Sequence, residues 1–511
     1  MSKIINFLNK KIFIYKIELL YFLFDLLIIM FTYSAFFEFT ISSDNLKIFM
    51  DQGSNSIVTM DYIYSGRYTI YIFGKILELF GFDYLYNQIY SQFFKMVCIA
   101  FCVICFTIVF SKNNKLCINK IKTYPIINLI LLFSFVNVFY VETFIYITPD
   151  WGLGLILSFL SFLMFTKKKI LLAFLFAILT VCEYQVYLVI TGCAILTYII
   201  LTEDKLFTLD AVKKYLSLIF VTIGSLIFGI ALPIILNFIG IINKTSKKIS
   251  LENGINFKIR IKEIIEMIIY VFRDAKGMMP YMIIFYFCFG IIALFVIDIF
   301  TDKKNKLKKI YVTIICGLLL LIPFCLGFIT AGFYMPARVL FPFFFSISMV
   351  TLISYLMTDN LSLKKIIVVL STSFLLISIF NTRQAAMDHY TSNLLDFQYG
   401  KEVQEKIDCY ERETGETIKV IKYLKWHERD KTWSYSEFLH HDYYDTNYNI
   451  KLVYDDWGIV PLIEFISGRK YDEEYMTQEE FNNIFNDVDW SYINLEKQIK
   501  FKDETLYWAV Y

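Results

Sequence analysis

The sequence predicts a polytopic α-helical membrane protein of about eleven transmembrane helices, with interfacial helices in its outer loops and a small α/β domain at the C-terminus. Of its 511 residues, 57% are hydrophobic and 19% are charged, whereas about a quarter of the residues are charged in ordinary soluble domains. Several apolar runs approach the ~20 residues that cross a bilayer as a helix. These observations exclude a soluble globular protein.

Charge divides the chain near Asn381. Residues 381–511 carry 15 Lys and Arg and 26 Asp and Glu, a net charge of −11. The totals of 49 basic and 47 acidic residues leave 34 and 21 for residues 1–380, a net charge of +13. A basic membrane region is expected where cytoplasmic loops adjoin anionic lipid. We therefore expect a transmembrane domain over 1–380 and a soluble acidic domain over 381–511.

Eleven apolar runs are candidate spans. The first follows Lys3, Lys10 and Lys11 and contains no small-residue cleavage site, so it is expected to be an uncleaved helix and not a signal peptide. The expected spans are 17–39, 92–110, 124–141, 152–166, 169–182, 185–202, 215–240, 281–300, 311–329, 339–357 and 365–380.

Lysine clusters orient these helices. Every second connection is rich in lysine, as the positive-inside bias requires of cytoplasmic loops. The lysines concerned are Lys112, Lys115, Lys120, Lys122, Lys167, Lys168, Lys169, Lys205, Lys213, Lys214, Lys303, Lys304, Lys306, Lys308, Lys309, Lys364 and Lys365. The N-terminus is therefore expected in the cytoplasm and the C-terminal domain outside. One long helix over 169–202 would invert the later topology, because only Glu183-Tyr184-Gln185 separates its two short runs.

Three segments are expected on the outer side. The loop 40–91 is polar, and the loop 241–280 ends in an amphipathic helix with Ile264 and Ile268 on one face and Lys262 and Glu266 on another. Such a helix should lie flat at the membrane surface. The third segment is the tail, where strand and helix patterns alternate and five tryptophans can supply a small core: Trp426, Trp433, Trp457, Trp490 and Trp508.

The first outer loop holds the candidate catalytic residues. Asp44 lies in Ser42-Ser43-Asp44-Asn45, Asp51 follows it, and Arg67 lies in Ser65-Gly66-Arg67. A carboxylate at the membrane surface can deprotonate an acceptor hydroxyl, and an arginine can hold a phosphate through two hydrogen bonds. The arrangement suits transfer from a phosphorylated lipid, with Glu38 as a second candidate base. The alternative is that these carboxylates are solvated loop residues and that Glu38 caps its helix.

Other outward positions can complete a cleft. Asp150-Trp151 sets a carboxylate beside an aromatic face, and sugars favour such faces because their C–H groups stack on rings. Trp151 also suits a membrane interface. Arg338 either binds a lipid phosphate or extends to the headgroups. Further candidates at the outer ends of helices are Glu183, Tyr184, Gln185 and Tyr334.

Asp25 supports a different hypothesis. It falls in the middle of the first span, where ionisation is costly and functional roles are common. Glu18 lies seven residues earlier on roughly the same face. The pair would suit a proton or ion relay in a transporter, or Asp25 is simply hydrogen-bonded within the bundle.

Several short motifs together resemble the GtrII-type glucosyl transferases, which are integral membrane glycosyltransferases of the GT-C type. These motifs are the acidic first loop, the Ser-Gly-Arg at 65–67 with the aromatic run 68–73, the Glu-Tyr-Gln-Val-Tyr at 183–187, and the segment 334–338. The resemblance covers roughly residues 20–380, and more loosely 454–458. Relatives often carry two adjacent acidic residues in the first loop, whereas this chain has Asp44 followed by Asn45.

The resemblance implies transfer of a glucosyl or related hexosyl residue from a polyprenyl-phosphate donor to a cell-surface polysaccharide, such as O-antigen, outside a bacterial inner membrane. Asp44 would act as the base, with Glu38 as the substitute, and Arg67 would bind the donor phosphate. The expected partners are the lipid-linked donor, a glycan acceptor and the bilayer, with no nucleic acid. A divalent cation stays open as a cofactor. The alternative functions are a polyprenyl-linked glycan flippase or transporter and a surface-glycan polymerase.

Overall fold

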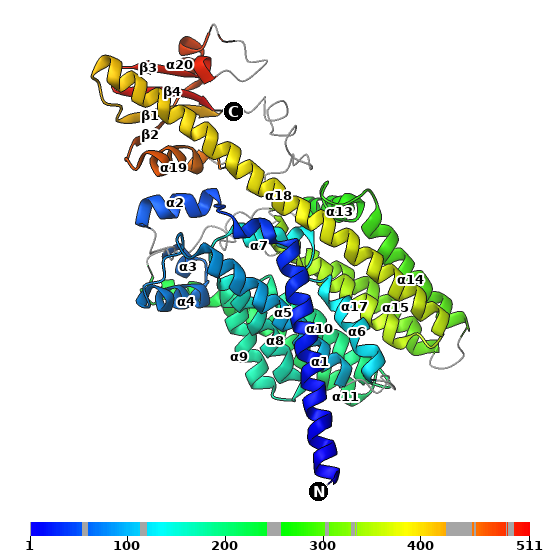
Figure 1. Cartoon of the computed structure of the whole chain (residues 1–511). Helices are drawn as coiled ribbons and strands as arrows, with labels where there is room; N and C mark the ends of the chain where they lie inside the picture. Colours follow the sequence, from blue (N-terminus) through cyan, green and yellow to red (C-terminus); the bar gives the residue numbers. More distant parts are fainter. Residues whose placement is uncertain are drawn as a thin grey trace.

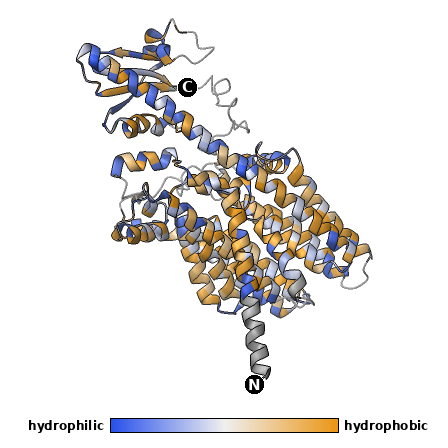
Figure 2. Ribbon diagram, in the orientation of Figure 1, coloured by the Kyte–Doolittle hydropathy of each residue, from blue (hydrophilic) through white to orange (hydrophobic). Residues whose placement is uncertain are grey.

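The structure is a computed structural model. It describes residues 2–53, 60–112, 120–242, 257–301, 306–328, 333, 335–425, 452–453, 456–486, 488 and 495–510. Helices form one large bundle, and a small sheet lies beyond one end of it (Figure 1). Hydrophobic residues dominate the bundle, whereas the sheet and the helices around it are far more hydrophilic (Figure 2).

The bundle is built from helices whose apolar residues face one another or the surroundings. Its helices are α1 (Ser2–Thr32), α5 (Gln88–Lys112), α6 (Lys120–Leu132), α8 (Asp150–Thr166), α9 (Ile170–Glu183), α10 (Tyr187–Thr202), α11 (Leu209–Ile219), α12 (Ser225–Phe238), α14 (Ile283–Thr301), α15 (Lys306–Leu321), α16 (Ala337–Leu340), α17 (Pro342–Met357) and α18 (Leu361–Thr414). A π-helical turn, η3 (Phe220–Gly224), joins α11 to α12, and a 3-10 segment, η4 (Ile322–Phe328), follows α15. Large side chains such as Leu171 and Phe289 are exposed on the outside of the bundle, which is where lipid would contact them.

Six helical stretches in the described part of the chain are long and apolar enough to cross a membrane. They are Gln88–Lys112, Leu209–Phe238, Ile283–Thr301, Lys306–Phe328, Ala337–Met357 and Leu361–Thr414. The chain is therefore a polytopic membrane protein. The expected number of eleven spans is not confirmed by helix length, because α8, α9 and α10 have 17, 14 and 16 residues. At 1.5 Å per residue they measure about 21–26 Å, less than the hydrocarbon core of about 30 Å.

The break expected between α9 and α10 is present. α9 ends at Glu183 and α10 begins at Tyr187, so two helices replace one long one. Hydrogen bonds fix their directions, because Ser161 near the end of α8 donates to the carbonyl of Ala173 near the start of α9, whereas Tyr187 donates to the carbonyl of Trp151 at the start of α8. α9 and α10 therefore run in opposite directions alongside α8.

Three expected spans have different limits. The span 17–39 ends earlier as an α-helix, because α1 stops at Thr32 and a 3-10 turn, η1 (Ser34–Phe37), follows. The span 124–141 is broken after Leu132, where Asn137 donates to the carbonyl of Ser134 and accepts from the amide of Tyr140. These local bonds satisfy the backbone groups that the helix would otherwise pair. The short helices η2 (Val138–Tyr140) and α7 (Val141–Ile145) follow.

The span 365–380 is part of a much longer helix. α18 begins at Leu361, where the Asn360 side chain accepts from the amides of Ser362 and Leu363, and it ends before Gly415, which has a φ of 77°. The change from apolar to polar composition near residue 381 does not end the helix, because residues in a helix interior pair their backbone groups within the helix whatever surrounds their side chains. α18 therefore continues from the bundle to the sheet (Figure 1).

The sheet has four strands in the order β2-β1-β4-β3. β1 (Val420–Lys425) pairs in parallel with both β2 (Asp472–Tyr475) and β4 (Thr505–Val510), and β3 (Ile499–Lys502) pairs antiparallel with β4. The helices of this region are α19 (Asp456–Ser467), α20 (Gln478–Ile484) and α21 (Leu495–Gln498). A small mixed sheet therefore occupies the C-terminal region, as the alternating patterns predict.

The two largest hydrophobic cores of the described residues lie at different levels of the molecule. The larger one is inside the helical bundle. The smaller one joins the sheet and α19 to the end of α18, and it also contains Ile41 and Leu46 from the first outer segment. Leu46 belongs to α2 (Ser43–Gln52), which packs against α19. The first outer segment is therefore held between the bundle and the sheet region.

The other segments that the sequence predicts on the outer side are helical as well where the structure describes them. α3 (Met60–Tyr64) and α4 (Tyr68–Leu79) follow α2, and α13 (Phe257–Asp274) is the amphipathic helix predicted in the second loop. Ile264 of α13 is buried, whereas Lys262 on its other face is 78% exposed. α2 and α13 lie toward the end of the bundle that faces the sheet, and the N-terminus lies at the opposite end (Figure 1).

Candidate functional site

Polar side chains gather where α2 and the starts of α8 and α10 meet, at the end of the bundle nearest the sheet. Asp44 is placed there by a helix cap, because the Ser42 hydroxyl accepts from the amide of Asn45 at the start of α2. A carboxylate in the first turn of a helix is stabilised by the helix dipole. Asn45 is 2% exposed, and its side-chain oxygen accepts from the Ser42 hydroxyl and from the amide of Ile147. The Asn45 amide thus has a structural role in placing the start of α2.

Asp44 is half-buried and receives hydrogen bonds from two aromatic side chains. The indole N–H of Trp457, in α19, donates to its Oδ1 at 3.1 Å, and the hydroxyl of Tyr146 donates to its Oδ2 at 3.5 Å. The carboxylate is therefore oriented from both sides. Trp457, which we expected in the core of the tail, instead reaches the first outer segment, and its side chain is 42% exposed.

Close helix packing brings Asp150 and Trp151 to the same region. A Cβ at Gly152 would lie 2.9 Å from the sulfur of Cys98, and one at Gly154 would lie 2.5 Å from Cε2 of Tyr187. Small residues at these positions let α8 approach α5 and α10 closely, as in other helix pairs of membrane proteins. The two glycines thus have a packing role.

The carboxyl group of Asp150 is buried and lies next to a second acid. Asp150 is 5% exposed and Glu183, at the end of α9, is 1% exposed. The two carboxyl groups interact electrostatically, and the Oε2 of Glu183 has no hydrogen-bond partner among the described residues. Two acids buried this close together are costly unless their charge is partly neutralised.

Two cations lie within electrostatic range of this carboxyl pair. Lys95 in α5 is 1% exposed, and it donates to the carbonyls of Thr143, at 3.0 Å, and Tyr146. Both Lys95 and Arg67 interact electrostatically with Asp150. The cations offset part of the cost of burying the acids.

Arg67 differs from the other cations of the site because its donors are available. Its guanidinium lies over the ring of Tyr184, 4.8 Å from the ring centroid. Within the described part of the chain, its side chain has no hydrogen bond and no ion pair. Arg338, by contrast, is held by Glu142 through both its side chain and its backbone amide. Glu142 is fully buried, so this pair is a structural link between α7 and α16.

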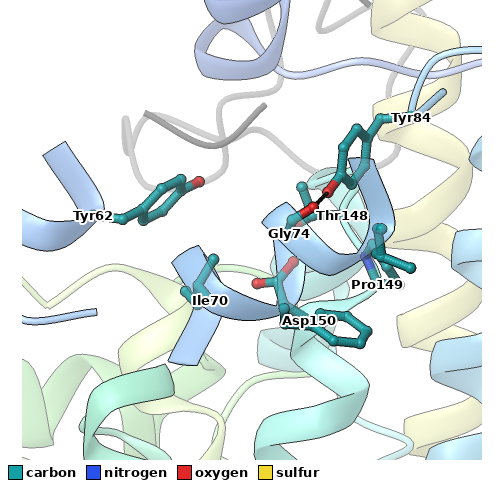
Figure 3. Close-up of a pocket in the computed structure, with 9 residues that line it drawn as sticks. Tyr62, Ile70, Gly74, Tyr84, Thr148, Pro149 and Asp150 are labelled. Carbon is teal, nitrogen blue, oxygen red and sulfur yellow. Dashed lines mark hydrogen bonds between the residues drawn. The ribbon is translucent and has the colours of Figure 1, made fainter. Parts of the chain in front are cut away.

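Tyr62 of α3 lies amid these groups. Burial raises the pKa of its hydroxyl, Asp150, Asp44 and Glu183 raise it further, and Arg67 opposes them. Tyr62 also lines a small pocket together with Tyr84 and Asp150. Figure 3 shows Tyr62 and Asp150 at this pocket, with the Tyr84 hydroxyl bonded to the carbonyl of Gly74.

Aromatic rings line the space between Asp44 and Asp150. The ring of Tyr146 stacks on Trp151 at 5.7 Å between centroids, and the guanidinium of Arg338 lies 5.4 Å from the centroid of the same Tyr146 ring. Trp151 in turn packs edge-on against Tyr184. Rings stacked beside carboxylates are typical of sites that bind sugars.

The structure therefore brings together six side chains that the sequence predicts for the site: Asp44, Arg67, Asp150, Trp151, Glu183 and Tyr184. Arg338 joins them, but with its charge already paired. Glu38 is exposed just after η1, and its side chain has no hydrogen bond or ion pair with the described residues; Asp51 is exposed and faces Lys47 at 3.8 Å. The side chain of Gln185 has no hydrogen bond with the described residues, and Tyr334 lies outside them.

The sequence analysis did not identify Tyr62, Lys95, Glu142 and Tyr146. Lys95 can be identified from the sequence, because a lysine within an apolar span is costly to bury and commonly has a function. Glu142 lies just after an expected span, where a charged residue is unremarkable. Tyr62 and Tyr146 are two of 37 tyrosines, and nothing in their local sequence distinguishes them.

Asp25 has a structural partner. It is fully buried and accepts a hydrogen bond from the amide of Asn128 at 2.8 Å. Glu18 instead faces Lys112 at 3.6 Å. Among the residues that the structure describes, no group of three His, Cys, Asp or Glu side chains is placed to hold a metal ion.

A bundle of membrane helices with buried acids, an available arginine and stacked rings at one end defines a class, the integral membrane enzymes that act on a charged lipid or a sugar. The family model for the glucosyl transferase GtrII matches residues 33–358. Because the match covers more than half of the chain, the protein belongs to the GtrII glucosyl transferase family and is a membrane glycosyltransferase. This confirms the resemblance seen in the sequence. No curated protein and no solved structure matches the chain.

Proposed function

We propose that the protein transfers a glucosyl or related hexosyl residue from a polyprenyl-phosphate donor to a cell-surface polysaccharide on the outer side of the membrane. The observation that carries this proposal is Arg67, whose guanidinium rests on Tyr184 with its donors available beside the buried acid Asp150. A guanidinium matches two phosphate oxygens through parallel hydrogen bonds. The donor phosphate would bind here, with its lipid chain in the bilayer.

Asp44 is the proposed base. It is half-buried, and its two hydrogen bonds to Trp457 and Tyr146 orient the carboxylate without adding a second charge. The acceptor hydroxyl would lie against this carboxylate and lose its proton to it as the oxygen attacks the anomeric carbon. Asp51 and Glu38 are exposed and lie apart from the stacked rings, which favours Asp44 among the three acids of the first outer segment.

The reaction balances with these groups alone. The bond between the acceptor oxygen and the anomeric carbon forms while the bond from that carbon to the phosphate oxygen breaks, and the leaving phosphate keeps the electron pair. Negative charge that develops on the phosphate would be stabilised by Arg67 and by the buried Lys95. Positive charge on the sugar ring would be stabilised by the nearby carboxylates.

The lysine-rich connections support the proposed orientation, with the N-terminus in the cytoplasm and the sheet region outside. Lys168, Lys213 and Lys214 line one cavity at the far end of the bundle. Lys308 donates to the carbonyl of Glu203 beside them. Several connections that the sequence assigns to the cytoplasm therefore lie at one end, as the positive-inside bias requires. Nucleotide sugars are not available outside, which favours a lipid-linked donor.

The proposal is tested by sugar transfer in membranes that contain the native protein or Asp44→Asn, with radiolabelled polyprenyl-phosphoglucose as the donor. Asparagine keeps the side-chain oxygen that accepts from Trp457, so the fold is expected to persist while transfer falls at least about a hundredfold. Glu266→Gln, an exposed carboxylate on α13, is the matched control and should keep full activity. Full activity of Asp44→Asn would contradict its role as the base and direct attention to Glu38 or Asp51. No transfer by the native protein would contradict the choice of donor.

A further inference from the structure

Trp457 belongs to a part of the chain that the family match does not cover. The match ends at residue 358, whereas Trp457 is the second residue of α19, in the sheet region. Its indole nevertheless bonds to Asp44, the proposed base, at the other end of the sequence. The sheet region therefore contributes directly to the site.

The backbone around Trp457 is held in place on two sides. A Cβ at Gly458 would lie 2.0 Å from the carbonyl oxygen of Leu452, so only glycine permits the approach of this backbone to α19, and the same Cβ would lie 3.1 Å from Cβ of Ser43 in α2. The hydroxyl of Tyr423 in β1 donates to the carbonyl of Asp456 at 3.0 Å. Ile459, one turn into α19, is fully buried in the smaller core. The position of the indole is thus set by the fold.

Trp457 is exposed although its helix is firmly packed. Its side chain is 42% exposed, whereas Trp508 in the same region is fully buried. The indole N–H is used by Asp44, so the ring faces are the part of the side chain that remains for another molecule. An aromatic face next to a carboxylate binds a pyranose well, because the ring stacks on sugar C–H groups while the carboxylate accepts from a hydroxyl.

The position of Trp457 relative to Arg67 and Lys95 suits binding of the acceptor and not of the donor. Arg67 and Lys95 lie toward the bundle, where a lipid phosphate can enter from the bilayer. The indole of Trp457 bonds to Asp44, and α19, which carries Trp457, lies on the sheet side of α2, away from the bundle (Figure 1). A polysaccharide chain is water-soluble and would reach Asp44 from this side.

We propose that Trp457 forms the acceptor subsite, where the indole stacks on the pyranose that receives the new sugar and its N–H orients Asp44. This inference rests on the proposed function and extends it to the sheet region. The ring face and the N–H make separate contributions, and two substitutions separate them. Trp457→Phe keeps an aromatic face and removes the N–H, whereas Trp457→Ala removes both.

The experiment uses the full-length protein in lipid vesicles, with polyprenyl-phosphoglucose as the donor and purified surface polysaccharide of the source strain as the acceptor. KM is measured for each substrate separately. Trp457→Ala is expected to raise the KM for the polysaccharide about fivefold or more, up to about the tenfold change that the loss of a stacked ring can cause. The KM for the donor should stay within about twofold of the native value. Trp457→Phe is expected to keep the polysaccharide KM within about threefold and to lower kcat. Tyr475→Ala, at another exposed aromatic residue of the sheet region, is the matched control.

A second measurement separates failure of this inference from failure of the proposed function. Binding of the fluorescently labelled polysaccharide is measured without donor, for the native protein and for both variants. Weaker binding by Trp457→Ala, with binding retained by Trp457→Phe, supports the subsite even if the donor has been assigned wrongly. Equal binding by native protein and Trp457→Ala, or an unchanged polysaccharide KM in an active Trp457→Ala enzyme, overturns the inference and leaves the proposed function intact.

Discussion

Substitution of Arg67 tests the proposed donor-phosphate site directly, because the proposal rests on the availability of its guanidinium donors. Its guanidinium rests on the ring of Tyr184 and has no hydrogen bond or ion pair within the described residues. If it binds the donor phosphate, Arg67→Ala removes two charge-assisted hydrogen bonds. Each contributes about 1.5–3 kcal/mol, and each 1.4 kcal/mol corresponds to a tenfold change in rate. The lower bound of about 3 kcal/mol therefore predicts a loss of at least about a hundredfold in kcat/KM.

Arg67→Lys refines this prediction. Lysine keeps the positive charge but provides a point charge in place of a planar fork, and it stacks less well on Tyr184. We expect it to lose about tenfold in kcat/KM, roughly the value of one of the two hydrogen bonds. The assay is transfer from polyprenyl-phosphoglucose by purified protein, with the donor concentration varied. The thermal unfolding midpoint is recorded in parallel, to show that the fold is intact.

Arg412→Ala is the matched control, because this arginine is exposed on α18 and contacts only its own helix. It should transfer sugar at the native rate. Arg67→Ala with a kcat/KM within about threefold of native would refute the assignment, since no contact worth 3 kcal/mol could then have been lost. The phosphate would in that case have to bind elsewhere in the site.

Two further predictions concern stability and packing. Asp298→Ala removes the fully buried carboxylate that Lys309 contacts at 2.6 Å. Breaking a buried ion pair costs about 3–5 kcal/mol, so the unfolding midpoint in detergent should fall clearly. An unchanged midpoint would show that Asp359, 3.0 Å from Lys309, is a sufficient partner. In Gly154→Ala the added Cβ would lie 2.8 Å from Cγ of Glu183, so sugar transfer should fall and the free energy of unfolding should drop by about 1–3 kcal/mol. Gly317→Ala is the control, because its Cβ would meet no atom within 4 Å, and it should match the native protein in transfer and in stability.

Some features of the site could be predicted from residue types alone. Asp44 and Arg67 were identified because an acid and an arginine in a polar outer segment suit lipid-phosphate chemistry, and the structure places both in one group with Asp150 and Glu183. Arg338 shows the limit of this reasoning. Whether an arginine is available depends on the acid opposite it, and Glu142 is 196 positions away in the sequence. Residue type therefore predicts a candidate, and the partner decides its role.

Trp457 shows the same limit for an aromatic residue. From the sequence it was expected to help fill the core of the tail, as Trp508 does. The two differ because α19 is packed against α2 through Gly458, which directs Trp457 toward Asp44. The composition of the tail cannot show this, because the distinction depends on which face of a short helix meets another segment.

The sequence by itself determined the class of protein and the family, and it predicted which segments hold the candidate site. Within a bilayer the backbone N–H and C=O groups can bond only to one another, so long apolar runs form membrane helices. The lysine pattern predicts the direction in which each helix crosses the membrane. The tertiary structure decided where the helices end and which charges are paired. The change in composition near residue 381 shows only where α18 leaves an apolar environment. The helix itself begins after its cap at Asn360 and continues to Gly415. Likewise, Asp44, Asp150 and Trp457 meet only in the fold, because contacts between distant segments follow from packing and not from local pattern.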